Sequence, residues 1–205
     1  MRRSWWLRVA ALLIGGAAVI HDLYGPWAGQ EGRLAIGLLV LVLFLALMQG
    51  DAAAVGIARP APSVRWWLRA SLITGSIFCA VVVAIVAVLY AAGYLPPLIP
   101  VDDPAGRLWE ACVVAPLVEE PIYRLALCVP LVVIIGYWPT IVISGAVFAL
   151  LHHRYGNLSP DNALAGLLLG WAYLRSGSLA LPILLHVIGN ALVFLAVYFV
   201  MPLLL

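Results

Sequence analysis

The sequence predicts an all-α protein, a polytopic helical membrane protein with its helices in one bundle. Three observations lead to this prediction: 65% of the 205 residues are apolar, only 10% are charged, and the mean hydropathy is +1.11. Soluble proteins carry about 25% charged residues. Because a helix needs about 20 residues to cross a bilayer, the chain has room for about seven transmembrane helices, within a range of about six to eight.

Hydrophobic runs bounded by polar residues, Pro or Gly predict the individual helices. The first run follows a basic start, and Trp5 and Trp6 are expected at the membrane interface. This run looks like a signal peptide but lacks a clear cleavage site before His21 and Asp22, so we interpret it as a retained span. The predicted spans cover residues 5–22, 33–49, 68–93, 108–136, 138–153, 161–175 and 178–203.

Two connections are polar enough to leave the membrane. They are the Ala- and Pro-rich stretch from Gly50 to Arg65 and the stretch from Pro96 to Arg107. No internal repeat interrupts the pattern, so residues 1–205 are expected to form a single membrane domain. Within it, residues 1–107 hold the N-terminal spans and loops without motifs. Residues 108–203 hold the core helices, which carry every motif described below and are expected to enclose an intramembrane polar cavity.

The arginines predict an orientation. With seven spans, one side receives the basic residues and the other side receives acidic ones, and the positive-inside rule then places the N-terminus in the cytoplasm. The chain contains no Lys, and its Arg- and Ala-rich composition indicates a bacterial inner membrane. A net charge of +2 is too small and too scattered for nucleic-acid binding. The basic set is Arg2, Arg3, Arg8, Arg59, Arg65, Arg69 and Arg175, and the acidic set is Asp22, Glu31, Asp102 and Asp103.

The most informative polar residues lie inside the fourth predicted span. Glu119 and Glu120 are adjacent, so their side chains point about 100° apart on a helix and have different surroundings. Glu120 and Arg124 are four residues apart and can form an ion pair on one face. Glu119 has no local partner. Pro121 removes a backbone hydrogen bond and is expected to bend the helix and free a carbonyl beside the carboxylates.

Two further patterns each occupy an apolar helix. Phe148 lies one turn before His152, so its ring can pack against the imidazole, and a neutral histidine is a usable base near pH 7. In the last span, His186 and Asn190 present two hydrogen-bonding groups on one face, and Gly189 is expected to permit close helix approach. Taken singly, each pattern is also compatible with a purely structural role. Charged and polar groups at membrane depth are costly, which favours a functional role for all three together.

The order EExxxR, FxxxH and HxxxN resembles the CPBP family of CAAX proteases and bacteriocin-processing enzymes, also called the Abi family. The resemblance covers Glu119 to Asn190 and the neighbouring helices, about half of the chain. It implies a multi-span intramembrane endopeptidase. Two departures concern the first motif, where the family often has Phe before and Gly after the arginine and this chain has Tyr123 and Leu125. Pro121 after the second glutamate is also less usual, so the substrate is more in doubt than the reaction.

The resemblance also implies roles. Glu119 and His152 would position and deprotonate a water molecule, and His186 with Asn190 would stabilise the oxyanion. Glu120 and Arg124 would order the site, and Phe148 would support the second motif. The family was first described as metalloenzymes, and a zinc ion would have Glu119, His152 and His186 as ligands. We favour a site without cofactor or metal, because the chain has neither an HExxH nor an HxxxH pair, and keep zinc as the alternative.

The expected substrate is a membrane-anchored protein or peptide that is cut near its C-terminus. Prenylated substrates are not expected in a bacterium, so the candidates are bacteriocin processing or immunity, or removal of a C-terminal sorting tag as in the myxosortase-like branch. The alternative is a non-proteolytic membrane protein, either a small transporter or an immunity protein that binds a peptide, because proton-coupled carriers also use intramembrane Glu, Arg and His. The absence of a repeated half argues against a transporter.

Overall fold

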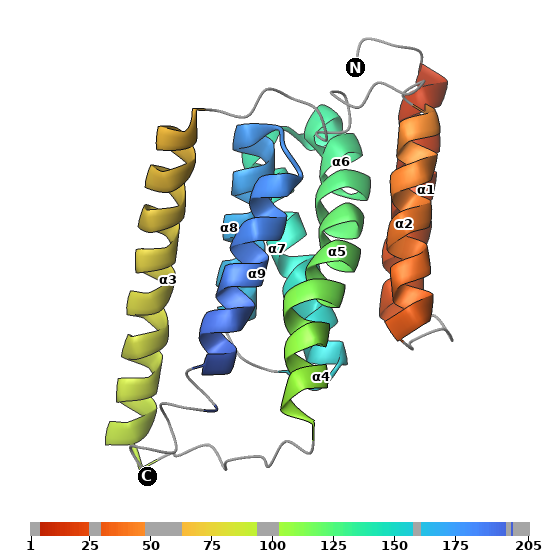
Figure 1. The fold of residues 1–205 in the computed structure, drawn as a ribbon. Coiled ribbons are helices and arrows are strands. Elements are labelled where there is room, and N and C mark those ends of the chain that lie inside the picture. Colours follow the sequence, from red (N-terminus) through yellow and green to blue (C-terminus); the bar gives the residue numbers. More distant parts are fainter. Residues whose placement is uncertain are drawn as a thin grey trace.

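The computed structural model describes residues 5–24, 30–47, 63–93, 103–157, 161–195 and 198. Over these residues the chain is helical and has no strand, so the prediction of an all-α fold is confirmed. The long helices run side by side along one common direction (Figure 1). They are α1 (Trp5–Tyr24), α2 (Gln30–Leu47), α3 (Val64–Ala91), α7 (Tyr137–Arg154), α8 (Asp161–Ser176) and α9 (Ala180–Leu195).

The predicted span 108–136 is a helix with two wider turns. Asp103 caps its start by accepting a hydrogen bond from the Gly106 amide at 2.9 Å. Proline has no N–H to donate, and a π-helical turn begins at Pro121, where the sequence predicts the helix to bend. The segment ends at Gly136, whose φ of +83° suits glycine. Its parts are α4 (Pro104–Trp109), π-turn η1 (Glu110–Val114), α5 (Ala115–Glu120), π-turn η2 (Pro121–Ala126) and α6 (Cys128–Ile135).

The predicted helix boundaries agree with the observed ones to within four residues, apart from the predicted end at residue 203, which lies outside the described part. The largest shifts are at the starts of α3 and α4, each four residues earlier than predicted. Searched over the described residues, the structure has no helix that combines the length and apolar character needed to cross a membrane. Most of the two predicted polar connections, the side chains of Trp5 and Trp6, and the chain beyond Leu195 except Tyr198 lie outside the described part.

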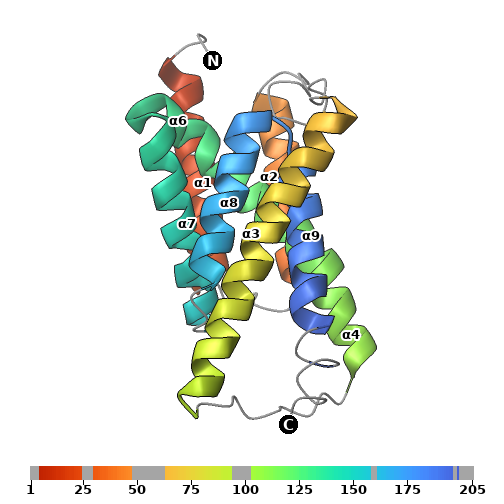
Figure 2. The same cartoon turned by 90° about the vertical axis from the view of Figure 1, so that its left-hand side faces the viewer.

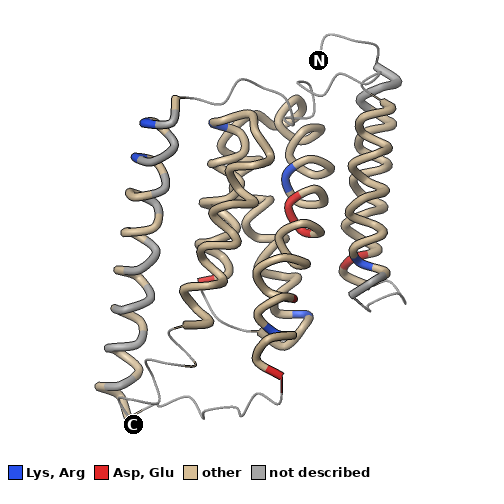
Figure 3. Tube along the Cα trace, in the orientation of Figure 1, with Lys and Arg blue, Asp and Glu red and all other residues tan. Residues whose placement is uncertain are grey.

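The charge distribution along the bundle can be compared with the predicted orientation. Figure 3 shows basic residues in the first turns of α3 and the last turn of α8 at one end of the bundle. Acidic residues at the starts of α4 and α8 lie toward the opposite end, where α4 and the last turn of α7 also carry basic residues. Which end faces the cytoplasm stays a prediction. Arg2, Arg3, Arg59 and Asp102 and the side chains of Arg8 and Glu31 lie outside the described part.

Helices α1 and α2 pack together against α5 and η2. Two glycines allow this close approach: a Cβ at Gly15 would overlap the carbonyl oxygen of Ala126, and one at Gly37 would lie 3.0 Å from the Cα of Val118. Phe44 of α2 and Ile122 of η2 are fully buried in the resulting core. The N-terminal helices are therefore packed directly onto the segment that carries the paired glutamates.

Helices α7, α8 and α9 complete the surroundings of that segment. Helix α8 packs against both α7 and α9, and α9 also contacts α5 and η1. Helix α3 lies across α8 and α9 on the outer side (Figure 2). This arrangement brings the second half of α7 and the middle of α9 to the same level as the end of α5.

Candidate active site

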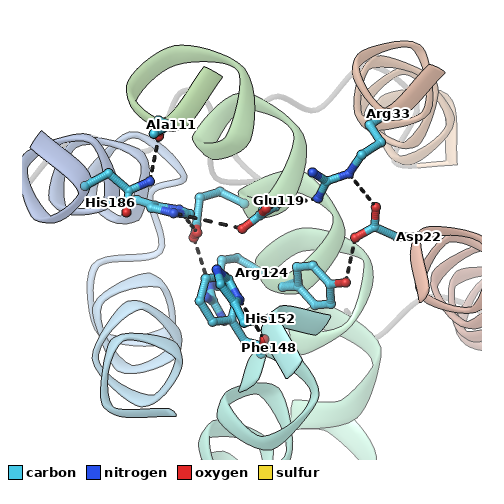
Figure 4. Close-up of polar contacts among 11 residues, drawn as sticks. Asp22, Arg33, Ala111, Glu119, Arg124, Phe148, His152 and His186 are labelled. Carbon is cyan, nitrogen blue, oxygen red and sulfur yellow. Dashed lines mark hydrogen bonds and ion pairs between the residues drawn. The ribbon is translucent and has the colours of Figure 1, made fainter. Parts of the chain in front are cut away.

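Glu120 lies at the centre of a buried hydrogen-bonded cluster. Figure 4 shows its partners Arg124 and His186 close to Glu119. Its Oε2 accepts a hydrogen bond from Nε of Arg124 at 2.8 Å, and both side chains are completely buried. This is the ion pair that the four-residue spacing predicts. Its Oε1 lies 2.8 Å from Nδ1 of His186, which comes from α9, 66 residues away. Arg124 also donates from Nη1 to Ser144 Oγ at 2.6 Å, so this helix segment is tied to α7 as well.

The contact with Glu120 determines which nitrogen of His186 is available. An ionised carboxylate only accepts hydrogen bonds, so Nδ1 carries the hydrogen and Nε2 of the neutral ring is an acceptor. Nε2 donates only when the ring is doubly protonated. It lies 3.9 Å from Oε2 of Glu119. The imidazole of His186 therefore stands between the two adjacent glutamates, with one nitrogen toward each.

Glu119 has one anchored oxygen and one free oxygen. Its Oε1 accepts a hydrogen bond from Nη2 of Arg33 at 3.0 Å. Its Oε2 is buried and has no hydrogen-bond partner among the residues the structure describes. The sequence predicted no local partner, and the actual partner is 86 residues away in α2. A carboxylate held at one oxygen leaves the second available for a water or substrate proton.

Arg33 belongs to a second polar cluster that the sequence did not reveal. Its Nε donates to Oδ1 of Asp22 at 3.0 Å, and the hydroxyl of Tyr123 donates to Oδ2 of Asp22 at 2.7 Å. Tyr155 donates to the backbone carbonyl of Asp22 at 2.8 Å. Burial raises the pKa of Tyr155, so the phenol stays protonated and remains a donor. Asp22 and Arg33 lie in spans that carry no motif. The sequence signal that could have revealed their contact is their opposite charge at the facing ends of two consecutive predicted spans.

His152 is oriented by Phe148, one turn earlier on α7. Its Nδ1 lies 3.0 Å from the Phe148 carbonyl oxygen, which only accepts, so Nδ1 carries the hydrogen and Nε2 is free to act as a base. The two rings pack with their centroids 4.5 Å apart. The centroid of the Phe148 ring lies 5.6 Å from the centroid of the His186 ring and 5.0 Å from the guanidinium carbon of Arg124. One buried aromatic ring thus sets the positions of both histidines and the arginine.

Asn190 lies one turn beyond His186 on α9. One amide hydrogen is donated to the Ala111 carbonyl oxygen at 2.6 Å, which leaves the second N–H for another acceptor. The expectation for Gly189 was wrong. No described atom lies within 4 Å of a Cβ placed there, and Gly189 instead lines a cavity, because α9 turns this face away from its neighbours.

That cavity has a volume of about 400 Å³ and lies between α7, α8 and α9, with Gly75 of α3 on its outer side. His152, His186 and Asn190 reach its wall. Most of the remaining lining is apolar and comes from α8 and α9, with a second polar group formed by Asn157, Asp161 and Asn162. Within the described chain, Glu119 is not part of this lining, and it meets the cavity side only through His186.

The residues proposed as zinc ligands do not form a metal-binding group as they are arranged here. The described residues contain no group of three or more His, Cys, Asp or Glu side chains that could hold a metal ion. His186 uses Nδ1 for Glu120, and His152 uses Nδ1 for a backbone carbonyl. These hydrogen bonds orient the two rings and leave the lone pair on Nε2 of each neutral ring unused by them.

Comparison with known proteins bears on the three motifs directly. Residues 102–192 match the family model described as Type II CAAX prenyl endopeptidase Rce1-like. This stretch is an Rce1-like domain of the CPBP family. The Rce1-like domain contains every motif residue from Glu119 to Asn190, and the match supports endopeptidase activity of the CAAX-protease type. No curated protein and no solved structure matches the chain. Helices α1, α2 and α3 lie outside the matched residues.

Proposed function

We propose that this protein is a glutamate-dependent intramembrane endopeptidase that cuts a membrane-anchored protein or peptide near its C-terminus. One observation carries the proposal: the unpartnered Oε2 of Glu119 lies 3.9 Å from Nε2 of His186. This separation is too long for a direct hydrogen bond. It is within reach of a single water molecule that lies off the line between the two atoms and contacts both.

The proposed reaction begins with that water. Glu119 Oε2 accepts one of its protons, assisted by Nε2 of His152, while the water oxygen attacks the carbonyl carbon of the scissile peptide. The carbonyl π electrons move to oxygen and form a tetrahedral oxyanion. When the oxyanion collapses and re-forms the carbonyl, the carbon–nitrogen bond breaks and the proton passes from Glu119 to the leaving amine. Every atom and charge is returned, and the chain's own residues supply each proton transfer.

Stabilisation of the oxyanion is assigned to His186 and Asn190. The second amide hydrogen of Asn190 is not used by Ala111, and Nε2 of a doubly protonated His186 is a charged donor. Donors placed in advance within a low-dielectric site stabilise developing negative charge without rearranging. Glu120, held by Arg124, keeps the His186 ring in place through Nδ1.

A membrane setting is part of the proposal. The chain is 65% apolar, and large apolar side chains cover the outer faces of several helices. Exposed apolar surface of this extent is typical of a protein covered by lipid or by a partner. Prominent exposed residues are Leu13, Ile20, Leu38, Val42, Leu72, Val88, Ile134, Trp138 and Val142. We place the N-terminus in the cytoplasm of a bacterium on the arginine distribution.

The test measures cleavage of co-expressed single-span substrates with apolar C-terminal tails by the full chain. We expect Glu119→Gln to lower the rate by about 10²- to 10⁴-fold, because it removes the proton acceptor while keeping the shape. His152→Ala and His186→Ala should also abolish cleavage. His153→Ala is the matched control, because His153 neighbours His152 but is exposed.

Two results would contradict the proposal. Equal cleavage by wild type and the Glu119→Gln variant would remove the general base. Solute flux in proteoliposomes without any peptide cleavage would favour a carrier instead. Cleavage that is lost on chelation and restored by zinc would replace the metal-free version of the proposal with a metalloprotease.

A further inference from the structure

We propose that Arg33, from the N-terminal helix α2, is a positioning residue that holds Glu119 for catalysis. Asp22 of α1 in turn holds Arg33. The inference rests on the proposed role of Glu119, but it concerns a part of the chain outside the Rce1-like domain. It makes α1 and α2 part of the active centre.

The geometry of the guanidinium carries this inference. Arg33 donates from Nε to Asp22 and from Nη2 to Glu119, both at 3.0 Å, so a single planar group links two carboxylates. The Asp22 and Glu119 side chains are 1% and 5% exposed, and that of Arg33 is 16% exposed. Arginine presents its donors in a rigid fork, so fixing one arm on Asp22 determines where the other arm points.

Both carboxylate oxygens and the backbone carbonyl of Asp22 accept hydrogen bonds. Its second carboxylate oxygen accepts from Tyr123, which is fully buried and lies four residues after Glu119 on the same segment. The ring of Tyr155 lies 5.2 Å from the Arg33 guanidinium carbon, and its hydroxyl binds the Asp22 backbone. Residues from α1, α2, η2 and the end of α7 therefore fix the guanidinium, and a cluster this complete orients its target strongly.

The consequence falls on the reactive oxygen of Glu119. With Oε1 bound to Arg33, the carboxylate plane cannot rotate freely, and Oε2 stays directed toward His186. Without Arg33, Glu119 would be a buried carboxylate without a counter-ion, and such a group either takes up a proton or moves.

The first experiment measures kcat and KM for a cleavable single-span substrate with the purified full chain. Because Arg33 acts through Glu119 and does not contact substrate, Arg33→Gln should lower kcat by about 10²-fold with little change in KM. Arg33→Lys should recover part of kcat, because it restores the charge without the fork. Arg107→Gln is the control, since Arg107 is exposed on α4 and should behave as wild type.

The second experiment needs no activity. Dicyclohexylcarbodiimide modifies protonated carboxyl groups in apolar surroundings, and mass spectrometry identifies the site. Labelling of Glu119 should rise several-fold in Arg33→Gln, less in Arg33→Lys, and not at all in Arg107→Gln. Thermal unfolding of each variant, read in detergent, ensures that only folded protein is compared.

The outcomes separate this inference from the proposed function. If Glu119→Gln abolishes cleavage while Arg33→Gln retains wild-type kcat, the endopeptidase stands and the positioning role of Arg33 is overturned. If Glu119 labelling does not respond to Arg33→Gln, the ion pair is absent and the inference is again overturned. If wild type cleaves nothing but labelling responds as expected, the ion pair is supported and the endopeptidase proposal has failed.

Discussion

At the scale of single residues, the decisive feature is that His186 stands between two adjacent carboxylates. Consecutive helical positions point about 100° apart, which the sequence shows, and the structure uses that angle to place one glutamate on each side of an imidazole. Glu120 is bound at both oxygens and Glu119 at one. Glu119 therefore keeps one carboxylate oxygen available for a further hydrogen bond, whereas both oxygens of Glu120 are already bound.

Arg124 provides a stability prediction at this scale. Arg124→Met removes the guanidinium bound to Glu120 and leaves a buried carboxylate beside His186. We expect the free energy of unfolding to fall by about 3–5 kcal/mol, the usual effect of breaking a buried ion pair. Unfolding in detergent, followed by circular dichroism, measures the change. Arg154→Gln, on an exposed side chain, should leave it unchanged, and equal loss in both variants would contradict the prediction.

At the scale of helices, sequence pattern was sufficient for the individual elements and for contacts within one helix. The hydrophobic runs locate the helices, and i, i+4 spacing locates Glu120 with Arg124 and Phe148 with His152. Pairing between helices was not predictable, because Arg33 and Glu119 are 86 residues apart and periodicity carries no information on which faces meet. Gly189 shows the same limit: a small residue permits close packing but does not require it.

Packing of α1 and α2 onto the segment that carries Glu119 and Glu120 gives a prediction at the element scale. Gly15→Ala should weaken this packing, because the new methyl group overlaps the Ala126 carbonyl oxygen. Displacing α1 and α2 moves Arg33, so we expect both lower thermal stability and lower cleavage activity. Gly16→Ala is the matched control, since no described atom lies within 4 Å of its new methyl group. Greater loss in Gly16→Ala than in Gly15→Ala would refute the packing argument.

At the scale of the whole molecule, the cavity and the buried charges lie together inside the bundle. Asp22, Glu119 and Glu120 face Arg33 and Arg124, so three carboxylates meet two guanidiniums when both histidines are neutral. The doubly protonated His186 that we propose to stabilise the oxyanion is the third cation, and with it the charges of the cluster balance.

The cavity itself can be tested by filling it. Gly189→Leu should place a side chain into the space of about 400 Å³, because Gly189 lines this cavity and a Cβ there has no described atom outside its own helix within 4 Å. We expect KM for a bulky substrate tail to rise at least tenfold while thermal stability is kept or increased, because apolar volume is filled. Gly16→Leu, on the other side of the bundle, controls for the added side chain. Unchanged KM would show that substrate does not enter this cavity.

The π-helical turn at Pro121 has a consequence for the chain's evolution. A wide turn is an α-helix with one residue too many, and each residue corresponds to about 100° of rotation. Residues before and after η2 are therefore out of phase by that angle relative to an unbroken helix, and the displaced Tyr123 carbonyl is satisfied by Ser144 and Cys128. Deleting one residue here would restore helical regularity and at the same time turn the glutamates away from their partners. A length change at this point is therefore far less tolerable than a change of residue type.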